Sequence, residues 1–253
     1  MGAEAAKARI AVRDQVRACR GCDLYRSCTA PVPFYGPMSA TVAVLGEAPG
    51  KQEDKVGRPF VGPAGQLLRR LMFDVGINPD ELAWLNTVSC FPGRTPTGRE
   101  IDVCSSNRLA QLEVLSPAHL LVAGGVALST IRSDLKITQV HGRVFSDVEG
   151  RWVFPVHHPS AALRNPQLVD VLAKDLDRWV AIVRSARPWD HVSLSCVSCG
   201  RLADRYDPDG LGWCQSHIAR AIRGWERSNR DRSLIQPSLR PVIEDVKVRG
   251  ALI

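Results

Sequence analysis

Short apolar runs rich in β-branched residues alternate with amphipathic stretches along this chain, and that rhythm restricts the fold more than any other feature. Residues 41–45 form the first such run and end in a turn of glycine and proline, as a buried strand does. Apolar residues then recur three and four apart between Pro63 and Gly76, which predicts a helix that begins at the proline and stops at the glycine. The apolar face of this helix should cover a sheet.

The alternation continues to about residue 183. Further strands are predicted at 84–88, 119–123 and 152–156, with helices at 105–115, from about 126, and at 168–183. This order predicts an α/β fold with a mostly parallel central sheet and helices on both faces. Ligands of such sheets bind in the loops that follow the strands.

Composition and charge restrict the class of protein. Hydrophobic residues make up 45% of the 253 residues, and no apolar run approaches the ~20 residues that span a bilayer, so we expect no membrane partner. Residues 1–17 have the pattern of an amphipathic helix without the apolar core of a secretory signal, which favours a cytoplasmic protein. A net charge of +7 favours a polyanionic partner, although a basic surface also serves solubility alone.

The pattern of strands and helices breaks near residue 188, so we expect one domain at 1–187 and a small basic appendix at 188–253. The appendix carries the spacing of a Cys3His zinc site, with Cys196, Cys199, Cys214 and His217 as candidate ligands of a zinc ion. Unliganded thiols are the alternative. The arginines that follow these ligands either clamp DNA or form a solvated face.

Five segments carry the longest patterns in the chain: GEAPG at 46–50, GRPFVGPAG at 57–65, NTVSC at 86–90, PGRTPTGRE at 92–100 and HPSAALRNP at 158–166. In composition and order they resemble the motifs of the family 4 uracil-DNA glycosylases, which are iron-sulfur enzymes. The resemblance spans about residues 19–183. It implies a monofunctional glycosylase that flips uracil out of single- or double-stranded DNA and hydrolyses its N-glycosidic bond, leaving an abasic site for base excision repair. We further expect a monomer that is associated with the nucleoid.

The resemblance assigns four cysteines as ligands of a [4Fe-4S] cluster: Cys19, Cys22, Cys90 and Cys104. Thiolates suit the soft iron of such clusters, and a zinc site built from the same four residues is the alternative. The segment between the last two ligands is slightly shorter than is usual in the family, which leaves the shape of this loop open. Cys28 matches no ligand and is expected to be an ordinary thiol.

Three further residues match the family's base-binding and catalytic positions. Phe60 aligns with an aromatic that stacks on the flipped base, and Asn86 with an amide that matches the N3–H and O4 of uracil but mismatches cytosine. His158 aligns with the histidine that donates to uracil O2 and stabilises the leaving base. Outside this context Phe60 would be read as a core residue and Asn86 as a turn or cap residue. The neighbouring His157 is expected to be structural.

The chain offers no evident general base. In a better-known branch of the superfamily an aspartate follows the first strand, but this position is Ala48 here, as in family 4. Glu47 is the nearest carboxylate for positioning water, and Glu53 resembles a residue that crowds out the 5-methyl group of thymine. Both glutamates could equally cap loops.

The second motif of the family usually supplies a wedge that fills the gap left by the flipped base. Where a leucine is common, four residues after the histidine, this chain has Ala162, and Leu163 and Arg164 follow. Because a smaller wedge offsets less of the cost of flipping, single-stranded or mismatched substrates should be preferred.

Two rival functions stay open at this stage. The altered wedge and the appendix would also fit a glycosylase for another modified pyrimidine. The rival from another class is a protein that binds uracil or abasic sites in DNA without turnover. A related branch becomes covalently trapped on DNA through a histidine in a basic insertion, and no such insertion lies between Gly76 and Cys104.

Overall fold

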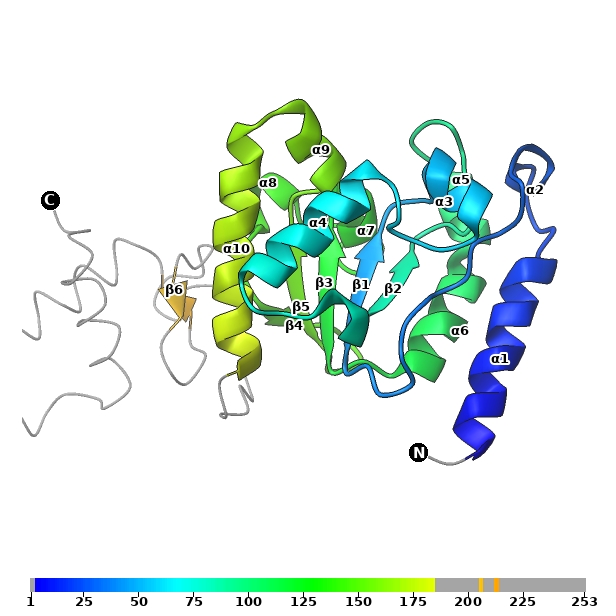
Figure 1. Cartoon of the computed structure of the whole chain (residues 1–253), viewed down its shortest axis with the longest axis horizontal. Coiled ribbons are helices and arrows are strands. Elements are labelled where there is room, and N and C mark those ends of the chain that lie inside the picture. Colours follow the sequence, from blue (N-terminus) through cyan, green and yellow to red (C-terminus); the bar gives the residue numbers. More distant parts are fainter. Residues whose placement is uncertain (1–2, 185–204, 207–211, 214–253) are drawn as a thin grey trace, which may run out of the picture. The chain divides into compact units, whose positions relative to one another are not determined.

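The computed structural model describes residues 3–184, 205–206 and 212–213. One sheet has the strand order β2-β1-β3-β5-β4, with β1 Val42–Gly46, β2 Ala83–Asn86, β3 His119–Ala123, β4 Phe145–Ser146 and β5 Trp152–Val156 (Figure 1). The strands β2, β1, β3 and β5 are parallel neighbours. Their carboxyl ends therefore meet at one edge, and the predicted α/β fold is confirmed.

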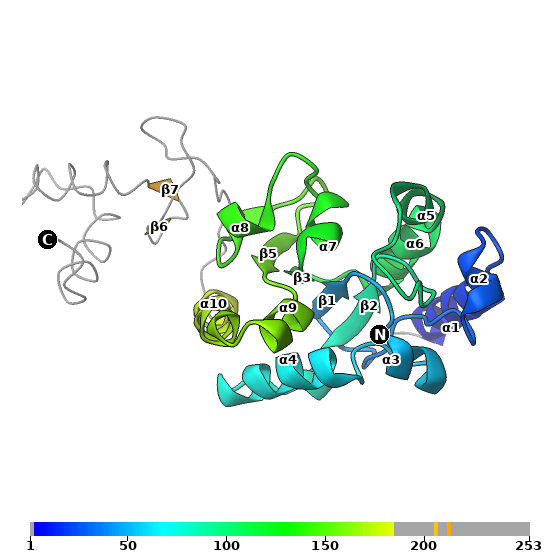
Figure 2. The ribbon, with the colours of Figure 1, turned by 90° about the horizontal axis from the view of Figure 1, so that it is seen from above.

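Helices cover both faces of this sheet (Figure 2). On one face lie α4 (Pro63–Asp74), α9 (Pro159–Arg164) and α10 (Gln167–Arg184), and on the other lie α6 (Ser105–Leu115), α7 (Gly125–Ser129) and α8 (Ile137–Val140). The remaining helical segments are α1 (Ala3–Ala18), which packs on α6, α2 (Leu24–Ser27), α3 (Lys51–Val56), η1 (Pro79–Glu81) and α5 (Gly98–Val103).

The core lies between the sheet and these helices because the parallel strands are apolar on both sides. Every residue of β1 is buried. From one face α4 contributes Leu68 and Met72, and α10 contributes Leu172, Leu176 and Trp179, all at most 1% exposed. This regular packing explains why the strands and the long helices can be predicted from the sequence.

Several element bounds differ from the prediction. The second strand ends at Asn86 rather than at residue 88, because the amides of Thr87 and Val88 turn to the carbonyls of Gly46 and Glu47, at 2.9 and 3.1 Å. The helix expected from about 126 is the short α7. The helices α3, α5 and α9 were not predicted, since six residues are too few to show an apolar period.

The larger of two compact units comprises Met1–Gly142 and Asp147–Arg184. Within the described part of the chain, no helix is long and apolar enough to cross a membrane. Described by itself, β6 (Arg205–Tyr206) pairs antiparallel with β7 (Gly212–Trp213). The expected zinc ligands of the appendix, Cys196, Cys199, Cys214 and His217, lie outside the described residues, and the boundary near 188 stays a prediction.

Candidate functional site

The carboxyl ends of four parallel strands bring the predicted site residues to one edge of the sheet. Gly46 and Asn86 end β1 and β2 and face each other in the ladder. Gly124 follows β3, and His157 and His158 follow β5. This group is called the strand-end site below, and it forms where ligands of parallel α/β sheets bind.

Gly46 is the point at which Phe60 and Asn86 meet. A Cβ atom on Gly46 would lie 2.5 Å from the Asn86 Oδ1 atom and 2.5 Å from the Phe60 ring, so only glycine fits between them. Both side chains are buried, at 6% exposure. The Asn86 amide makes no hydrogen bond to any described residue. The aromatic ring and the free amide thus converge on the end of β1.

His158 is fixed by the first turn of α9. It is the N-cap of that helix, with Pro159 next, and its Nδ1 atom accepts a hydrogen bond from the Ser160 backbone amide at 3.1 Å. An Nδ1 that accepts carries no proton, so the proton of the neutral ring is on Nε2, which is left to donate. Burial, and then the charge of Arg164, lowers the pKa of His158 to about 4. The ring is therefore neutral at physiological pH.

Glu47 follows β1 at the same edge and is partly buried. Burial raises the pKa of its carboxyl group, while a hydrogen bond from Thr95 and the charge of Arg164 act in the opposite direction. Arg164 therefore influences both Glu47 and His158. The next residue, Ala48, is half-buried and adds no polar group.

The Glu53 carboxylate joins two loops. One of its oxygens accepts from the Gly62 amide at 2.7 Å and the other from the Gly50 amide at 3.1 Å, and the side chain is 8% exposed. It therefore holds the segment after β1 against the start of α4. Glu53 thus links the segment after β1 to the loop that carries Phe60.

The exposure of the side chains on α9 shows which of them is accessible to serve as the predicted wedge. Ala162 is 1% exposed and faces the core, whereas Leu163 is 49% exposed. Arg164 is exposed as well. On this helix the accessible apolar side chain is thus one residue later than the position at which the family usually carries leucine.

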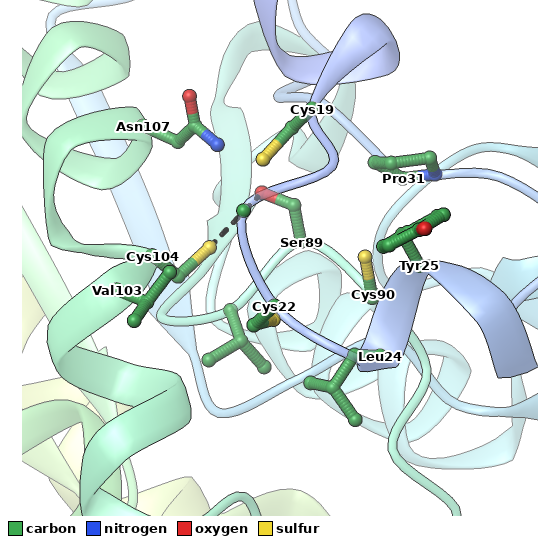
Figure 3. A pocket seen from close by; sticks show the side chains of 12 residues that line it. Cys19, Cys22, Leu24, Tyr25, Pro31, Ser89, Cys90, Val103, Cys104 and Asn107 are labelled. Carbon is green, nitrogen blue, oxygen red and sulfur yellow. Dashed lines mark hydrogen bonds between the residues drawn. The ribbon is translucent and has the colours of Figure 1, made fainter.

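A second pocket is lined by four cysteines from different parts of the chain (Figure 3). Cys19 follows α1, Cys22 precedes α2, Cys90 follows β2, and Cys104 joins α5 to α6. Together with neighbouring apolar residues they line a small cavity of about 10 Å³ that is partly open to solvent. This four-cysteine pocket brings together all the thiols that were predicted to share one cofactor.

Long-range contacts place these thiols. Arg9 of α1 is buried and donates to the carbonyls of Val114 and Leu115 at 3.0 and 3.3 Å, which ties α1 to the end of α6. The loop before Cys104 is closed by Glu100, which accepts from Arg94 at 2.8 and 2.9 Å. These hydrogen bonds give the short loop, whose shape the sequence left open, a definite form.

Two buried thiols of the pocket, those of Cys90 and Cys104, resist ionisation in the protein alone. Burial raises the pKa of Cys90 and of Cys104, and neighbouring thiols act in the same direction. Cys28, which matched no ligand, donates from its thiol to the Tyr25 carbonyl at 3.8 Å and lies close enough to Cys90 to raise the pKa of that residue. Metal binding deprotonates thiols, so a bound cationic group would remove this penalty.

Comparisons with known proteins agree with this geometry. The model of the uracil DNA glycosylase superfamily matches residues 33–183. The chain belongs to the uracil DNA glycosylase superfamily. It is 35% identical to a type-4 uracil-DNA glycosylase of Thermotoga maritima over 179 residues, which are 68% of this chain and 93% of that protein. It is also 35% identical to the type-4 enzyme of Archaeoglobus fulgidus, over 65% of this chain and 87% of that protein. A type-5 enzyme of Pyrobaculum aerophilum is 28% identical, over 68% of this chain and 85% of that protein.

Sequence reasoning missed the residues that orient the superfamily site. Ser160 selects the tautomer of His158, and its place two residues after a His-Pro pair could have marked a helix start. No sequence pattern marked Thr95 as a site residue, because its contact with Glu47 forms only when the loop is folded. His157 turns elsewhere, with its ring 4.4 Å from that of His141, which pairs with Asp175 at 2.7 Å.

Proposed function

We propose that this protein is a monofunctional uracil-DNA glycosylase that hydrolyses the N-glycosidic bond of uracil in DNA and leaves an abasic site for base excision repair. The observation that carries the proposal is the strand-end site, in which an aromatic ring, an unpaired amide and a neutral histidine meet one edge of the sheet. The names of the type-4 relatives support it.

Base recognition falls to Phe60 and Asn86. The ring of Phe60 stacks on the flipped base. Stacking of this kind does not distinguish one base from another. The Asn86 amide, free of protein partners, donates to O4 and accepts from N3–H of uracil, whereas cytosine presents the opposite pattern at these two atoms. Selection of uracil over cytosine therefore depends on the orientation in which this amide is held.

The chemical step depends on His158. Breaking the N-glycosidic bond places negative charge on uracil O2 and positive charge on the sugar, and the Nε2–H of the neutral imidazole donates to that oxygen. Because Ser160 holds Nδ1 as an acceptor, the donor is oriented before the substrate arrives. Removing one such donor typically costs about 10² to 10³ in rate.

Glu47 positions the attacking water or the sugar. Its carboxyl group lies at the same edge as His158, within the field of Arg164. Ala48 leaves room there without supplying a base. Glu53 limits the space at the 5 position of the base by holding the loop that carries Phe60 against the segment after β1.

Leu163 and Arg164 fill the gap left by the flipped nucleotide. Leu163 is the exposed apolar residue of α9, and the buried Ala162 cannot reach DNA. An apolar wedge repays part of the unstacking cost of a few kcal/mol. Single-stranded uracil, which needs less unstacking, should be the better substrate.

A [4Fe-4S] cluster suits the four-cysteine pocket, with Cys19, Cys22, Cys90 and Cys104 as ligands. Four thiolates complete the coordination of such a cluster, whose role in this pocket is to join α1 and α6 to the segment after β2. Among the described residues, no three His, Cys, Asp or Glu side chains are close enough to hold one metal ion. The motifs around these four cysteines, which resemble those of the iron-sulfur family, favour the cluster over zinc.

The remaining expectations concern partners and the appendix. DNA is the substrate, and we propose a monomer that works in the cytoplasm at the nucleoid. The appendix at 188–253 would bind zinc through Cys196, Cys199, Cys214 and His217 and add phosphate contacts. Removing it should weaken DNA binding and flatten its salt dependence while sparing uracil excision.

Alkali-sensitive strand breaks test the function. Purified protein is incubated with single- and double-stranded oligonucleotides that carry one uracil, 5-hydroxymethyluracil or hypoxanthine, and then treated with alkali. Breaks at uracil above all are expected. Preferential breaks at another base would favour the rival glycosylase, and a complex that resists denaturation without breaks would favour a non-catalytic binder.

A further inference from the structure

Phe60 has a backbone conformation that an aromatic residue rarely adopts. Its φ is +57°, in the left-handed region, where a bulky side chain is a genuine outlier. Such a conformation is strained and persists only where its surroundings impose it. The question is which groups impose this conformation.

The start of α4 makes the conformation possible. A Cβ atom on Gly65 would collide with the carbonyl group of Phe60, so the glycine lets the helix approach that carbonyl. From the same helix, the Nε–H of Arg69 donates to the Phe60 carbonyl oxygen at 3.2 Å. Arg69 thus fixes the direction in which the strained peptide unit points.

The same arginine also supports the ring through Trp84. Its guanidinium lies 4.2 Å from the centre of the Trp84 ring, and the Trp84 and Phe60 rings are 5.1 Å apart at 53°. Trp84 is 1% exposed and is fixed by a hydrogen bond from its indole N–H to the Pro79 carbonyl at 3.0 Å. Arg69, Trp84 and Phe60 therefore form one continuous series of contacts.

Stability alone does not explain this placement of Arg69. Its side chain is 22% exposed, and burial lowers the pKa of the guanidinium. Its carboxylate partner, Asp80, is 3.4 Å away and 87% exposed, so it compensates little of the desolvation. The contacts that the buried guanidinium makes well are those to Phe60 and Trp84.

We propose that Arg69 is a positioning residue for the base-stacking face, holding Phe60 in its left-handed conformation so that the ring lies against Gly46 and Asn86. The inference rests on the proposed function of Phe60. Without the arginine, the backbone of residue 60 can relax toward ordinary φ values, and the ring leaves the end of β1. The substrate loses its stacking partner although Phe60 itself is unchanged.

A double-mutant cycle tests the coupling. Arg69→Met keeps the apolar stem and removes the donor, and Arg69→Lys keeps the charge without the planar fork. The matched control is Arg70→Met on the same helix, since Arg70 is exposed and pairs only at 3.9 Å with Asp74. Single-turnover uracil release is measured for each variant, for Phe60→Ala, and for Phe60→Ala combined with Arg69→Met.

If Arg69 acts through Phe60, Arg69→Met slows release by about ten- to a hundredfold, Arg69→Lys does not restore it, and the double variant is no slower than Phe60→Ala. A rate equal to that of the parent protein, or losses that multiply in the double variant, would overturn the proposal.

Hydrogen exchange separates this inference from the proposed function, because it needs no activity. The amides of residues 60–62 should exchange at least about tenfold faster in Arg69→Met and remain as they were in Arg70→Met. Unchanged exchange contradicts the positioning role even if uracil is released. Faster exchange in a protein that releases no uracil would keep the positioning role and reject the proposed substrate.

Discussion

The strand-end site and the four-cysteine pocket differ in what holds them together. The first lies where four buried strands end, and its side chains are fixed by ladder register and by a close approach at Gly46. The second is assembled from the ends of helices and from loops, and its buried thiols resist ionisation. The fold itself therefore organises the strand-end site, whereas we propose that a bound cluster completes the four-cysteine pocket.

The largest expected effect follows from removing a cluster ligand. Cys104→Ser should abolish the broad visible absorbance of the cluster and release hydrogen-exchange protection in residues 18–30 and 88–104, while the amides of β1 and β3 stay protected. Cys28→Ser is the matched control, because Cys28 lies beside Cys90 but outside the ligand set, and it should keep its colour. Loss of protection throughout the sheet would show that the two regions do not differ in this way.

Loss of the histidine donor should affect chemistry rather than structure. His158→Ala should lower the single-turnover rate by about 10² to 10³, with DNA affinity nearly unchanged, since the donor acts chiefly once the base carries charge. Ser160→Ala removes the hydroxyl group that lies 2.7 Å from Nδ1 but keeps the backbone amide that donates to Nδ1, so its loss of rate should be smaller than that of His158→Ala. Equal losses of affinity and rate in His158→Ala would contradict this role.

The substitution Asn86→Asp tests whether the Asn86 amide recognises the base. A carboxylate opposite O4 repels it, and about a tenfold or greater loss of uracil release is expected. The protonated acid can both donate and accept, so cytosine release should rise as the pH is lowered. Rates are compared on matched uracil and cytosine oligonucleotides, and an unchanged uracil rate would show that another group reads the base.

The pH dependence of stability tests the burial of His158. The unfolded chain takes up a proton near pH 6.5, whereas the folded protein does so near pH 4. Unfolding thus binds a proton between these values, and the free energy of unfolding falls as the pH is lowered from 7 to 5, by at most about 2 kcal/mol from this residue. His158→Gln should show a smaller fall in urea titrations. His119 and His157, whose pKa values burial also lowers, contribute equally to both proteins.

The strands and long helices could be predicted from the sequence because the spacing of their apolar residues reflects which side chains are buried. The strands β3 and β5 and the helix α6 have the predicted bounds. Contacts between segments that meet only in the folded structure could not be predicted. No local pattern indicates that Phe60 has a positive φ or that Arg69 donates to its carbonyl, since both depend on how closely α4 meets the loop. The position of Cys28 close to Cys90 could not be predicted for the same reason.

The central claim is that the strand-end site releases uracil and discriminates it from its close relatives. Three duplexes that differ only in uracil, thymine or cytosine opposite the same guanine are incubated with the protein, and the free bases are identified by mass. We expect one free uracil for each abasic site formed, no detectable thymine or cytosine, and no uracil from His158→Ala on the same timescale. Release of thymine at a rate similar to that of uracil, or tight binding of the uracil duplex without any free base, would contradict it.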